Sequence, residues 1–321
     1  MQAASPPTIR SLPVYGAVVL LTVAVTGLSF WSVLPLESAA FVVLMIAVVL
    51  TGIPHGAVDH LVAAELYDLD ASWGDQAKFY GFYLALMALY GALWLVAPGL
   101  SLGLFLVMTM YHFGQADLAY LSADGRQQRV AYLSRGLFLI GLPIVAFPEV
   151  VAPIFEAIGG IDMLAWSGLV QHQMAIASGL VVQHGLWLAA LWMRDVATPG
   201  QLMRELLNLA VLSLLFATVH PLVAFAVYFG FWHSLGHIFE LVRFFNRHDQ
   251  PTSMTDFYRK AALFTVLSFV LLGALYLAGD AFGSQMEMIA LLFILISVMT
   301  LPHMLIVERL YQQKGKTGHP A

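Results

Sequence analysis

Residues 38–66 read SAAFVVLMIAVVLTGIPHGAVDHLVAAEL. The run 38–53 is apolar enough to enter a bilayer, whose hydrocarbon core takes roughly 20 apolar residues as a helix. A proline, two glycines, two histidines and an aspartate follow within 52–60, before apolar residues resume. Proline and glycine weaken or kink a helix, and ionisable side chains inside a span are costly and often functional. The stretch therefore predicts a broken membrane helix that carries a polar site.

Similar apolar runs recur along the whole chain, separated by short polar or Pro/Gly-rich breaks. Of the 321 residues, 60% are hydrophobic and 10% are charged, whereas soluble proteins average roughly 45–50% and about 25%. The runs predict ten membrane-spanning helices, at 13–34, 38–66, 77–97, 100–121, 130–147, 163–193, 202–218, 221–243, 258–279 and 285–308. The first run is too long for a signal peptide, so we expect an uncleaved helix there. The sequence thus predicts an all-α, polytopic transmembrane helix bundle.

The basic residues predict how this bundle is oriented. With the N-terminus in the cytoplasm and ten alternating helices, all 14 Lys and Arg residues lie on the cytoplasmic side or at its interface. Loops rich in Lys and Arg remain in the cytoplasm. Both termini are therefore expected inside the cell.

The composition also limits the chemistry. The chain has no cysteine, which excludes disulfides, thiolate metal sites, iron–sulfur clusters and covalently attached haem. A net charge of −5 without a large basic patch argues against a nucleic-acid partner. Because 11 histidines remain, any metal site must use imidazole and carboxylate groups.

Ionisable residues gather in the even-numbered predicted helices, which all run in the same direction. Counting from each residue to the next cytoplasmic cation spreads the histidines over about 12 Å of depth, so a single polar cluster could contain them. The members are His55, Asp59 and His60 in the second helix, His112 and Asp117 in the fourth, His233, His237 and Glu240 in the eighth, and His303 in the tenth.

The spacing of His233 and His237 places both imidazoles on one helical face, where they could bind one metal ion. With His55 and His112 they form a plausible four-imidazole site. Imidazole suits iron, copper, zinc and nickel, so ligand type leaves the metal open. The other reading of each histidine is a buried side chain bonded to a backbone carbonyl or a serine.

The other polar residues of the group suit supporting roles. The carboxylates of Asp59, Asp117 and Glu240 could orient the histidine ligands. His303 is either a ligand or a supporting residue. His60, five residues after His55 and about 140° round the helix, suits support better than ligation.

Aromatic residues flank the histidines in sequence. They are predicted either to pack between helices or to line a channel for a long apolar ligand. The channel candidates are Tyr111, Phe113, Tyr228, Phe231 and Trp232.

Four segments together resemble the Brp/Blh family of membrane-bound β-carotene 15,15′-dioxygenases. They are Gly52-Ile-Pro-His55-Gly-Ala-Val-Asp59-His60, Tyr111-His112-Phe-Gly-Gln-Ala-Asp117, Phe231-Trp-His233-Ser-Leu-Gly-His237 and Pro302-His303-Met. The resemblance extends from about residue 38 to about residue 310. It implies one integral membrane domain with a catalytic bundle at 38–310, preceded by an N-terminal tail and extra helix at 1–37 and followed by a cytoplasmic tail at 311–321.

The resemblance also implies the activity. Family members cleave β-carotene at its central double bond with O2, giving two molecules of all-trans-retinal, and hold a non-haem Fe(II) through histidines. The matching positions are His55, His112, His233 and His237, and His303 matches a further family histidine. An inner membrane of a bacterial or archaeal cell, and a rhodopsin that receives the retinal, are implied as well.

A membrane transporter for metal ions or protons is the alternative, since it also needs histidines and carboxylates in the membrane interior. A transporter should show a polar relay from one face to the other. Here the candidates concentrate between the midplane and the cytoplasmic side, which favours a closed site.

Overall fold

A computed structural model of the chain describes residues 12–31, 36–121, 125–248, 250–281 and 287–317. Helices and short connections make up these residues, and no strand occurs among them. Nine of the described helices are long and apolar enough to cross a membrane, which confirms the prediction of an all-α, polytopic bundle. They are Pro13–Phe30, Ala39–Leu66, Trp73–Val96, Gly125–Ala146, Gln173–Met193, Pro199–Thr218, Pro221–Arg247, Met254–Ala278 and Met288–Gln313.

The one predicted span without a counterpart among these nine is the fourth, 100–121, which corresponds to α6 (Pro98–Leu118). It is a continuous helix, but its polar residues lower its hydropathy, and it is absent from the nine candidate spans among the described residues. The run predicted at 163–193 is interrupted: η2 (Met163–Ala165) and α9 (Ser167–Gln171) precede α10 (Gln173–Met193).

Helix α8 (Pro148–Gly159) was not predicted. Pro148 lies in the first turn, where a missing N–H is tolerated, and the helix ends at Gly160 with a left-handed φ of 64°. These are ordinary helix-start and helix-stop signals. The segment is short, however, and lies in a stretch that the sequence interpretation left as a loop.

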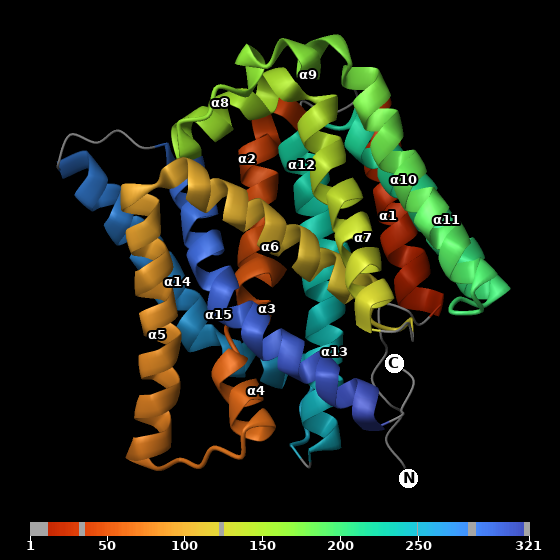
Figure 1. The fold of residues 1–321 in the computed structure, drawn as a ribbon. Coiled ribbons are helices and arrows are strands. Elements are labelled where there is room, and N and C mark those ends of the chain that lie inside the picture. Colours follow the sequence, from red (N-terminus) through yellow and green to blue (C-terminus); the bar gives the residue numbers. More distant parts are fainter. Residues whose placement is uncertain (1–11, 32–35, 122–124, 249, 282–286, 318–321) are drawn as a thin grey trace. The chain divides into compact units, whose positions relative to one another are not determined.

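Contacts within the chain define two compact units, whose positions relative to one another are not determined (Figure 1). The first unit comprises 1–18, 44–98 and 226–313, and the second comprises 19–43, 99–225 and 314–321. We describe each unit by itself. The single-domain organisation and the orientation of the termini stay predictions.

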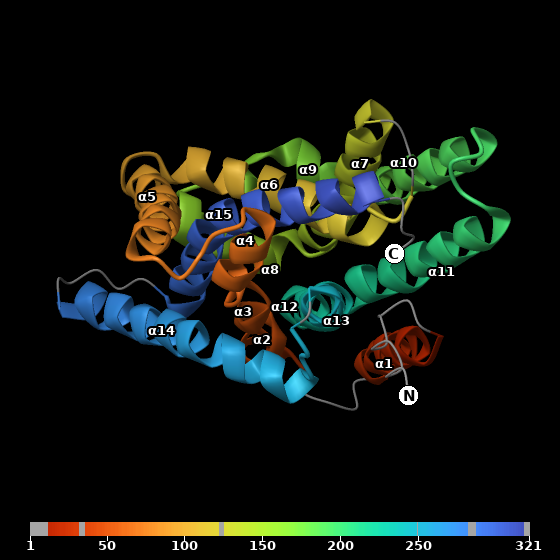
Figure 2. The same cartoon turned by 90° about the horizontal axis from the view of Figure 1, so that it is seen from below.

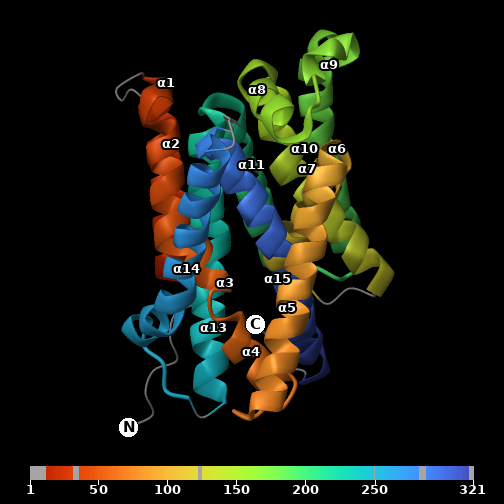
Figure 3. The same cartoon turned by 90° about the vertical axis from the view of Figure 1, so that its left-hand side faces the viewer.

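The first unit is built around the broken second span. Figure 2 shows α3 and α4 lying among α5, α13, α14 and α15, and α4, α5 and α13 reach the same end of the unit in Figure 3. The bounds are η1 Val48–Gly52, α3 Ile53–Gly56, α4 Asp59–Leu66, α5 Trp73–Val96, η3 Tyr228–Ser234, α13 Leu235–Arg247, α14 Met254–Ala281 and α15 Met288–Thr317.

A hydrophobic core holds these helices together. On α13 the buried Ile238, Leu241, Val242 and Phe245 recur at intervals of three and four residues, which places them on one helical face. They pack against Val62 and other buried residues of α4, α14 and α15.

The second unit contains α6, α7 (Gly125–Ala146), α8, η2, α9, α10 and α11 (Pro199–Thr218), and α7 packs against both α10 and α11. The helices α1 (Leu12–Phe30), α2 (Leu36–Ala47) and α12 (Pro221–Val227) contribute residues to both units. Helices α6 and α7 approach each other at Gly114 and Gly136. A Cβ atom at Gly114 would lie 1.8 Å from the Tyr132 carbonyl oxygen, so only glycine fits there.

The predicted break in the second span is confirmed. A π-helical segment, η1, runs into α3, and a turn at Ala57 and Val58 separates α3 from α4. Pro54 has no N–H to donate to the carbonyl of Leu50, four residues earlier. The hydroxyl of Tyr258 on α14 donates to that carbonyl instead, at 2.9 Å. The backbone group that proline leaves unmatched is thus satisfied by a neighbouring helix.

Candidate metal centre

Four histidine side chains from three stretches of the first unit meet around His55. The ring centroid of His55 lies 5.3 Å from that of His233, 5.6 Å from that of His237 and 5.0 Å from that of His303. The rings of His237 and His303 are 5.7 Å apart. All four side chains are buried. We call these four residues the histidine cluster.

The two π-helical segments hold His55 and His233 close together. They pack against each other where both backbones carry glycine. A Cβ atom at Gly52 would lie 2.6 Å from the ring of Phe229, and one at Gly230 would lie 3.1 Å from Ala47 Cβ. The ring of Phe229 also stacks on His233, with 5.9 Å between centroids. The close approach of η1 and η3 therefore brings the two imidazoles together.

A chain of hydrogen bonds fixes the ring of His303. Its Nδ1 lies 2.9 Å and 3.0 Å from the two carboxylate oxygens of Asp59, and the hydroxyl of Tyr83 donates to Asp59 Oδ2 at 3.0 Å. An ionised carboxylate only accepts, so Nδ1 carries the proton. The other nitrogen, Nε2, is then available as a metal ligand.

His55 and His237 have supporting groups of their own. The Nδ1 of His55 faces the carbonyl oxygen of Thr51 at 3.4 Å, a long contact that favours Nε2 as its ligand atom. Glu240 Oε2 lies 3.9 Å from His237 Nδ1, beyond hydrogen-bond distance, and accepts a hydrogen bond from Tyr311 at 2.9 Å. Each of two cluster histidines, His237 and His303, thus has a carboxylate beside it, and each carboxylate is held by a tyrosine.

This donor set fits a divalent metal ion. Because a metal–imidazole bond is about 2.1 Å and the ring adds about 1 Å, rings that share one ion have centroids roughly 4.5–6 Å apart. The four measured separations fall in that range. His55 and His303 offer nitrogen atoms within 4.8 Å of each other. Neutral imidazoles add no charge, so the carboxylates of Asp59 and Glu240 nearby would balance the charge of a divalent cation.

The remaining candidates of the fourth predicted helix lie in the second unit. His112 is on α6 and buried. Asp117 pairs with Arg135 of α7 at 2.8 Å, in a nearly buried ion pair. Asp117 therefore has a partner that the sequence interpretation, which placed Arg135 at the cytoplasmic interface, did not foresee.

The ring of His60 lies beside aromatic residues of α5 and α14. Its ring lies 4.7 Å from that of Phe264 and 6.3 Å from that of Tyr80. The turn between α3 and α4 changes the angle that five helical residues would give between His55 and His60. His60 lines a cavity, and its supporting role stays a prediction.

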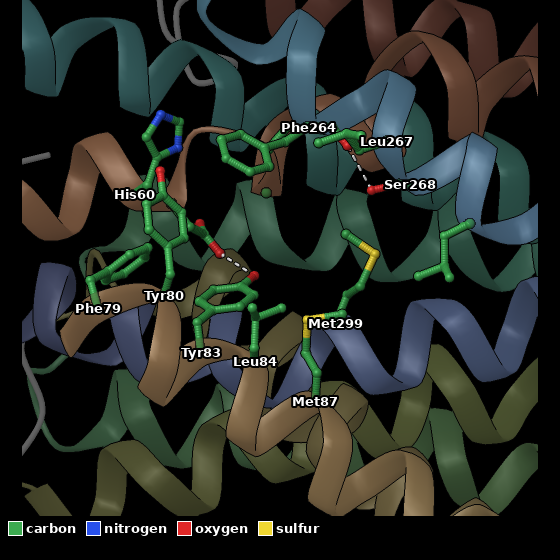
Figure 4. Close-up of a pocket in the computed structure, with 14 residues that line it drawn as sticks. His60, Phe79, Tyr80, Tyr83, Leu84, Met87, Phe264, Leu267, Ser268 and Met299 are labelled. Atoms are coloured by element: carbon green, nitrogen blue, oxygen red, sulfur yellow. Dashed lines mark hydrogen bonds between the residues drawn. The ribbon is translucent and has the colours of Figure 1, made fainter. Parts of the chain in front are cut away.

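This cavity has a volume of about 350 Å³ and lies within the first unit (Figure 4). Residues of the broken span form one wall, α5 and α14 supply most of the lining, and α15 adds one residue. The lining residues are Gly56, Ala57, Asp59, His60, Phe79, Tyr80, Tyr83, Leu84, Met87, Phe264, Leu267, Ser268, Leu271 and Met299.

The five predicted channel residues lie elsewhere, and none is among the described residues that line this cavity. Tyr228 and Trp232 are buried in η3, and Trp232 packs edge-on against Tyr15. Phe231 is exposed. In the second unit Tyr111 packs against Tyr132 and Phe113 stacks on Phe225. Their role in a channel stays a prediction.

Sequence reasoning missed Tyr83, Tyr311 and the aromatic residues of the cavity. Tyr83 lies on a helix without a histidine, and Tyr311 lies where a cytoplasmic tail was expected. A tyrosine inside an apolar span was the one signal for Tyr83, because a buried hydroxyl needs a partner.

Comparison with known proteins shows which family the chain is similar to. A family model described as beta-carotene 15,15′-dioxygenase matches residues 46–311. The probable beta-carotene 15,15′-dioxygenase Blh of Halobacterium salinarum is 27% identical over 316 residues, which cover 91% of this chain and 89% of the relative. The beta-carotene 15,15′-dioxygenase of an uncultured marine bacterium, 66A03, is 24% identical over 275 residues, covering 83% and 92%. No solved structure matches the chain.

Proposed function

Because this chain belongs to the beta-carotene 15,15′-dioxygenase family, we propose that it cleaves β-carotene at the central double bond with O2. Each oxygen atom ends in one aldehyde, so one β-carotene and one O2 give two all-trans-retinal. The observation that carries the proposal is the buried histidine cluster. Its histidines lie on membrane-spanning helices, and the surrounding bilayer is where an apolar substrate dissolves.

We propose Fe(II) as the metal, with His55, His233 and His237 as ligands. The family resemblance adds His112, and the geometry of the first unit adds His303. These two assignments are separable, because a ligand's replacement by alanine lowers the iron content of the purified protein. When bound, the iron would bind and activate O2 next to the polyene.

The side chains around the cluster have tasks of their own. Asp59 holds the proton on His303 Nδ1 and so keeps Nε2 directed at the metal. Glu240 adds negative charge beside His237. The buried apolar surroundings exclude water and strengthen these electrostatic contacts.

Expression in a bacterial host that accumulates β-carotene tests the proposal. We expect loss of orange colour and the appearance of retinal, measured by extraction and chromatography. His55→Ala should abolish both, whereas His172→Ala, on an exposed residue outside the cluster, should behave as wild type. Unchanged β-carotene despite confirmed membrane expression and ample iron would contradict the proposal and favour the transporter alternative.

Further parts of the proposal concern place and product. The nine apolar helices indicate an integral, multi-pass membrane protein. We propose an inner membrane of a bacterial or archaeal cell, with both termini in the cytoplasm. The apolar retinal would be released into the same bilayer, where a rhodopsin could take it up.

A further inference from the structure

We propose that the cavity between α4, α5 and α14 is a lateral port that admits one cyclic end of the polyene from the bilayer and holds it during cleavage. This inference rests on the proposed function and assigns a binding place to its substrate. The port is distinct from the aromatic residues that the sequence suggested as a channel.

The lining of the cavity suits a hydrocarbon. Its wall is mainly aromatic and aliphatic, with Phe79, Tyr80 and Phe264 at one end and Met87 and Met299 further along (Figure 4). Two of the three hydroxyl groups in the wall are already hydrogen-bonded: Tyr83 donates to Asp59, and Ser268 donates to the carbonyl of Phe264 on its own helix. An apolar ligand would therefore displace none of these hydrogen bonds.

The mouth of the cavity lies on the outer surface of two membrane-spanning helices. Leu84 on α5 is 58% exposed, and Leu267 and Leu271 on α14 are 49% and 41% exposed. Exposed leucines in a membrane span face lipid. A ligand dissolved in the bilayer can thus reach the cavity without passing through water.

The inner wall of the cavity touches the histidine cluster. Asp59, which lines the cavity, is hydrogen-bonded to His303. Gly56 also lines it, and a Cβ atom at Gly56 would lie 3.5 Å from His303 Nδ1. The absence of a side chain at Gly56 leaves the wall thin at this point.

The size and shape favour the end of a polyene over a whole molecule. A volume of about 350 Å³ is near the lower limit of small-molecule sites, which span roughly 300–1,000 Å³. A ring with a short piece of conjugated chain fits such a space, and flat aromatic walls pack well against a flat, rigid ligand. A lipid acyl chain is the competing occupant. Because it is flexible, it loses more conformational entropy on binding and gains less binding free energy from a preformed aromatic wall.

Tryptophan substitutions at the mouth test the port. Leu84→Trp and Leu267→Trp should narrow it and lower kcat/KM for β-carotene about tenfold, mainly through KM, at unchanged iron content. Leu89→Trp on α5 and Leu263→Trp on α14 are matched controls. These leucines are 68% and 63% exposed and are not among the described lining residues. The controls should retain wild-type kinetics.

A second measurement needs no turnover. In the His55→Ala background, the β-carotene that co-purifies with the protein should fall several-fold when Leu84→Trp or Leu267→Trp is added, and should be unaffected by the controls. Wild-type kinetics and retention in both port variants would overturn the port alone. A phospholipid found in the cavity by mass spectrometry, together with unaffected carotenoid retention, would also overturn it. A wild-type protein that forms no retinal, with no carotenoid retained by His55→Ala, would instead overturn the proposed function.

Discussion

Each unit of the molecule buries a polar group, and the two groups are built differently. In the second unit Arg135 pairs with Asp117 at 2.8 Å, while Ser134 bonds to Gln183 at 2.9 Å and to His184 at 3.1 Å. Opposite charges and polar side chains pair directly with one another there. In the first unit the ring of His55 lies 5.0–5.6 Å from the rings of three other histidines, and carboxylates lie beside His303 and His237.

The difference teaches how to interpret a polar residue in a membrane helix. Both groups are costly to bury, so cost alone does not identify a site. A group whose members neutralise one another links helices, as Arg135 and Asp117 link α7 and α6. A group that collects several ligands of one kind, with supporting carboxylates on the outside, is suited to hold an ion.

The largest effect is expected at His55, whose ring contacts all three others in the cluster. His55→Ala should reduce bound iron and retinal formation at least 100-fold, because the site loses a central ligand and with it the coordination geometry that holds the ion. Metal analysis of the purified protein gives the first value, and retinal chromatography gives the second. Full iron content in this variant would contradict the comparison, because the cluster would then not be the metal site and would be structural, like the polar network of the second unit.

A pair of aspartates gives the sharpest contrast. Asp59→Asn should lower iron affinity or activity about 10–100-fold, as is usual for groups that orient metal ligands. Asp117→Asn should leave iron per folded protein unchanged and lower the free energy of unfolding by about 3–5 kcal/mol, because Arg135 loses its charge partner. Metal titration and thermal unfolding in detergent distinguish the two. If both variants lowered iron affinity equally, the distinction between a metal-supporting Asp59 and a structural Asp117 would be contradicted.

A smaller effect is expected at Tyr83. Tyr83→Phe removes the hydroxyl that holds Asp59 but keeps the ring in the cavity wall. A hydrogen bond to a charged group contributes about 1.5–3 kcal/mol, so we expect iron affinity to fall roughly tenfold. Tyr90→Phe, on the same helix and outside the described cavity lining, is the matched control. An unchanged metal affinity would show that Asp59 keeps its orientation without Tyr83.

The smallest effect on the metal is expected at His184. Its ring stacks on Phe138, with 5.8 Å between centroids, and it bonds to Ser134. His184→Gln should preserve iron content within error and lower the free energy of unfolding by about 1–3 kcal/mol. Measurable loss of iron in this variant would assign a metal role to the second unit's network.

Much of the first unit could be predicted from the sequence. Pro54 and its flanking glycines indicated the break. The common direction of the even-numbered helices predicted that His55, His112, His233, His237 and His303 lie within about 12 Å of depth, so that one cluster could contain them. Within the first unit the structure brings His55, His233, His237 and His303 together. The sequence left His303 undecided between ligand and support, because its partner, Asp59, lies on another helix.

Other features depend on packing that no local pattern reveals. The π-helical segment at 228–234 contains no proline, and its geometry depends on its contact with η1. Beyond their first two turns, helices α5 and α14 are almost entirely apolar in sequence, so nothing indicated that Phe79 and Phe264 line a cavity. The turn at 57–58 also changes the angle between His55 and His60 that a continuous helix would give.

The carbonyl of Leu50 has a consequence for how the protein is made. Its hydrogen-bond donor, Tyr258, is 208 residues further along the chain. At about 5–20 residues per second, ribosomes take roughly 10–40 s to synthesise that interval. During this time the broken second span has already been synthesised, but the hydrogen bond from Tyr258 to the carbonyl of Leu50 cannot yet form. His303 is translated later still, so the histidine cluster can be completed, and iron loaded, only after this part of α15 is synthesised.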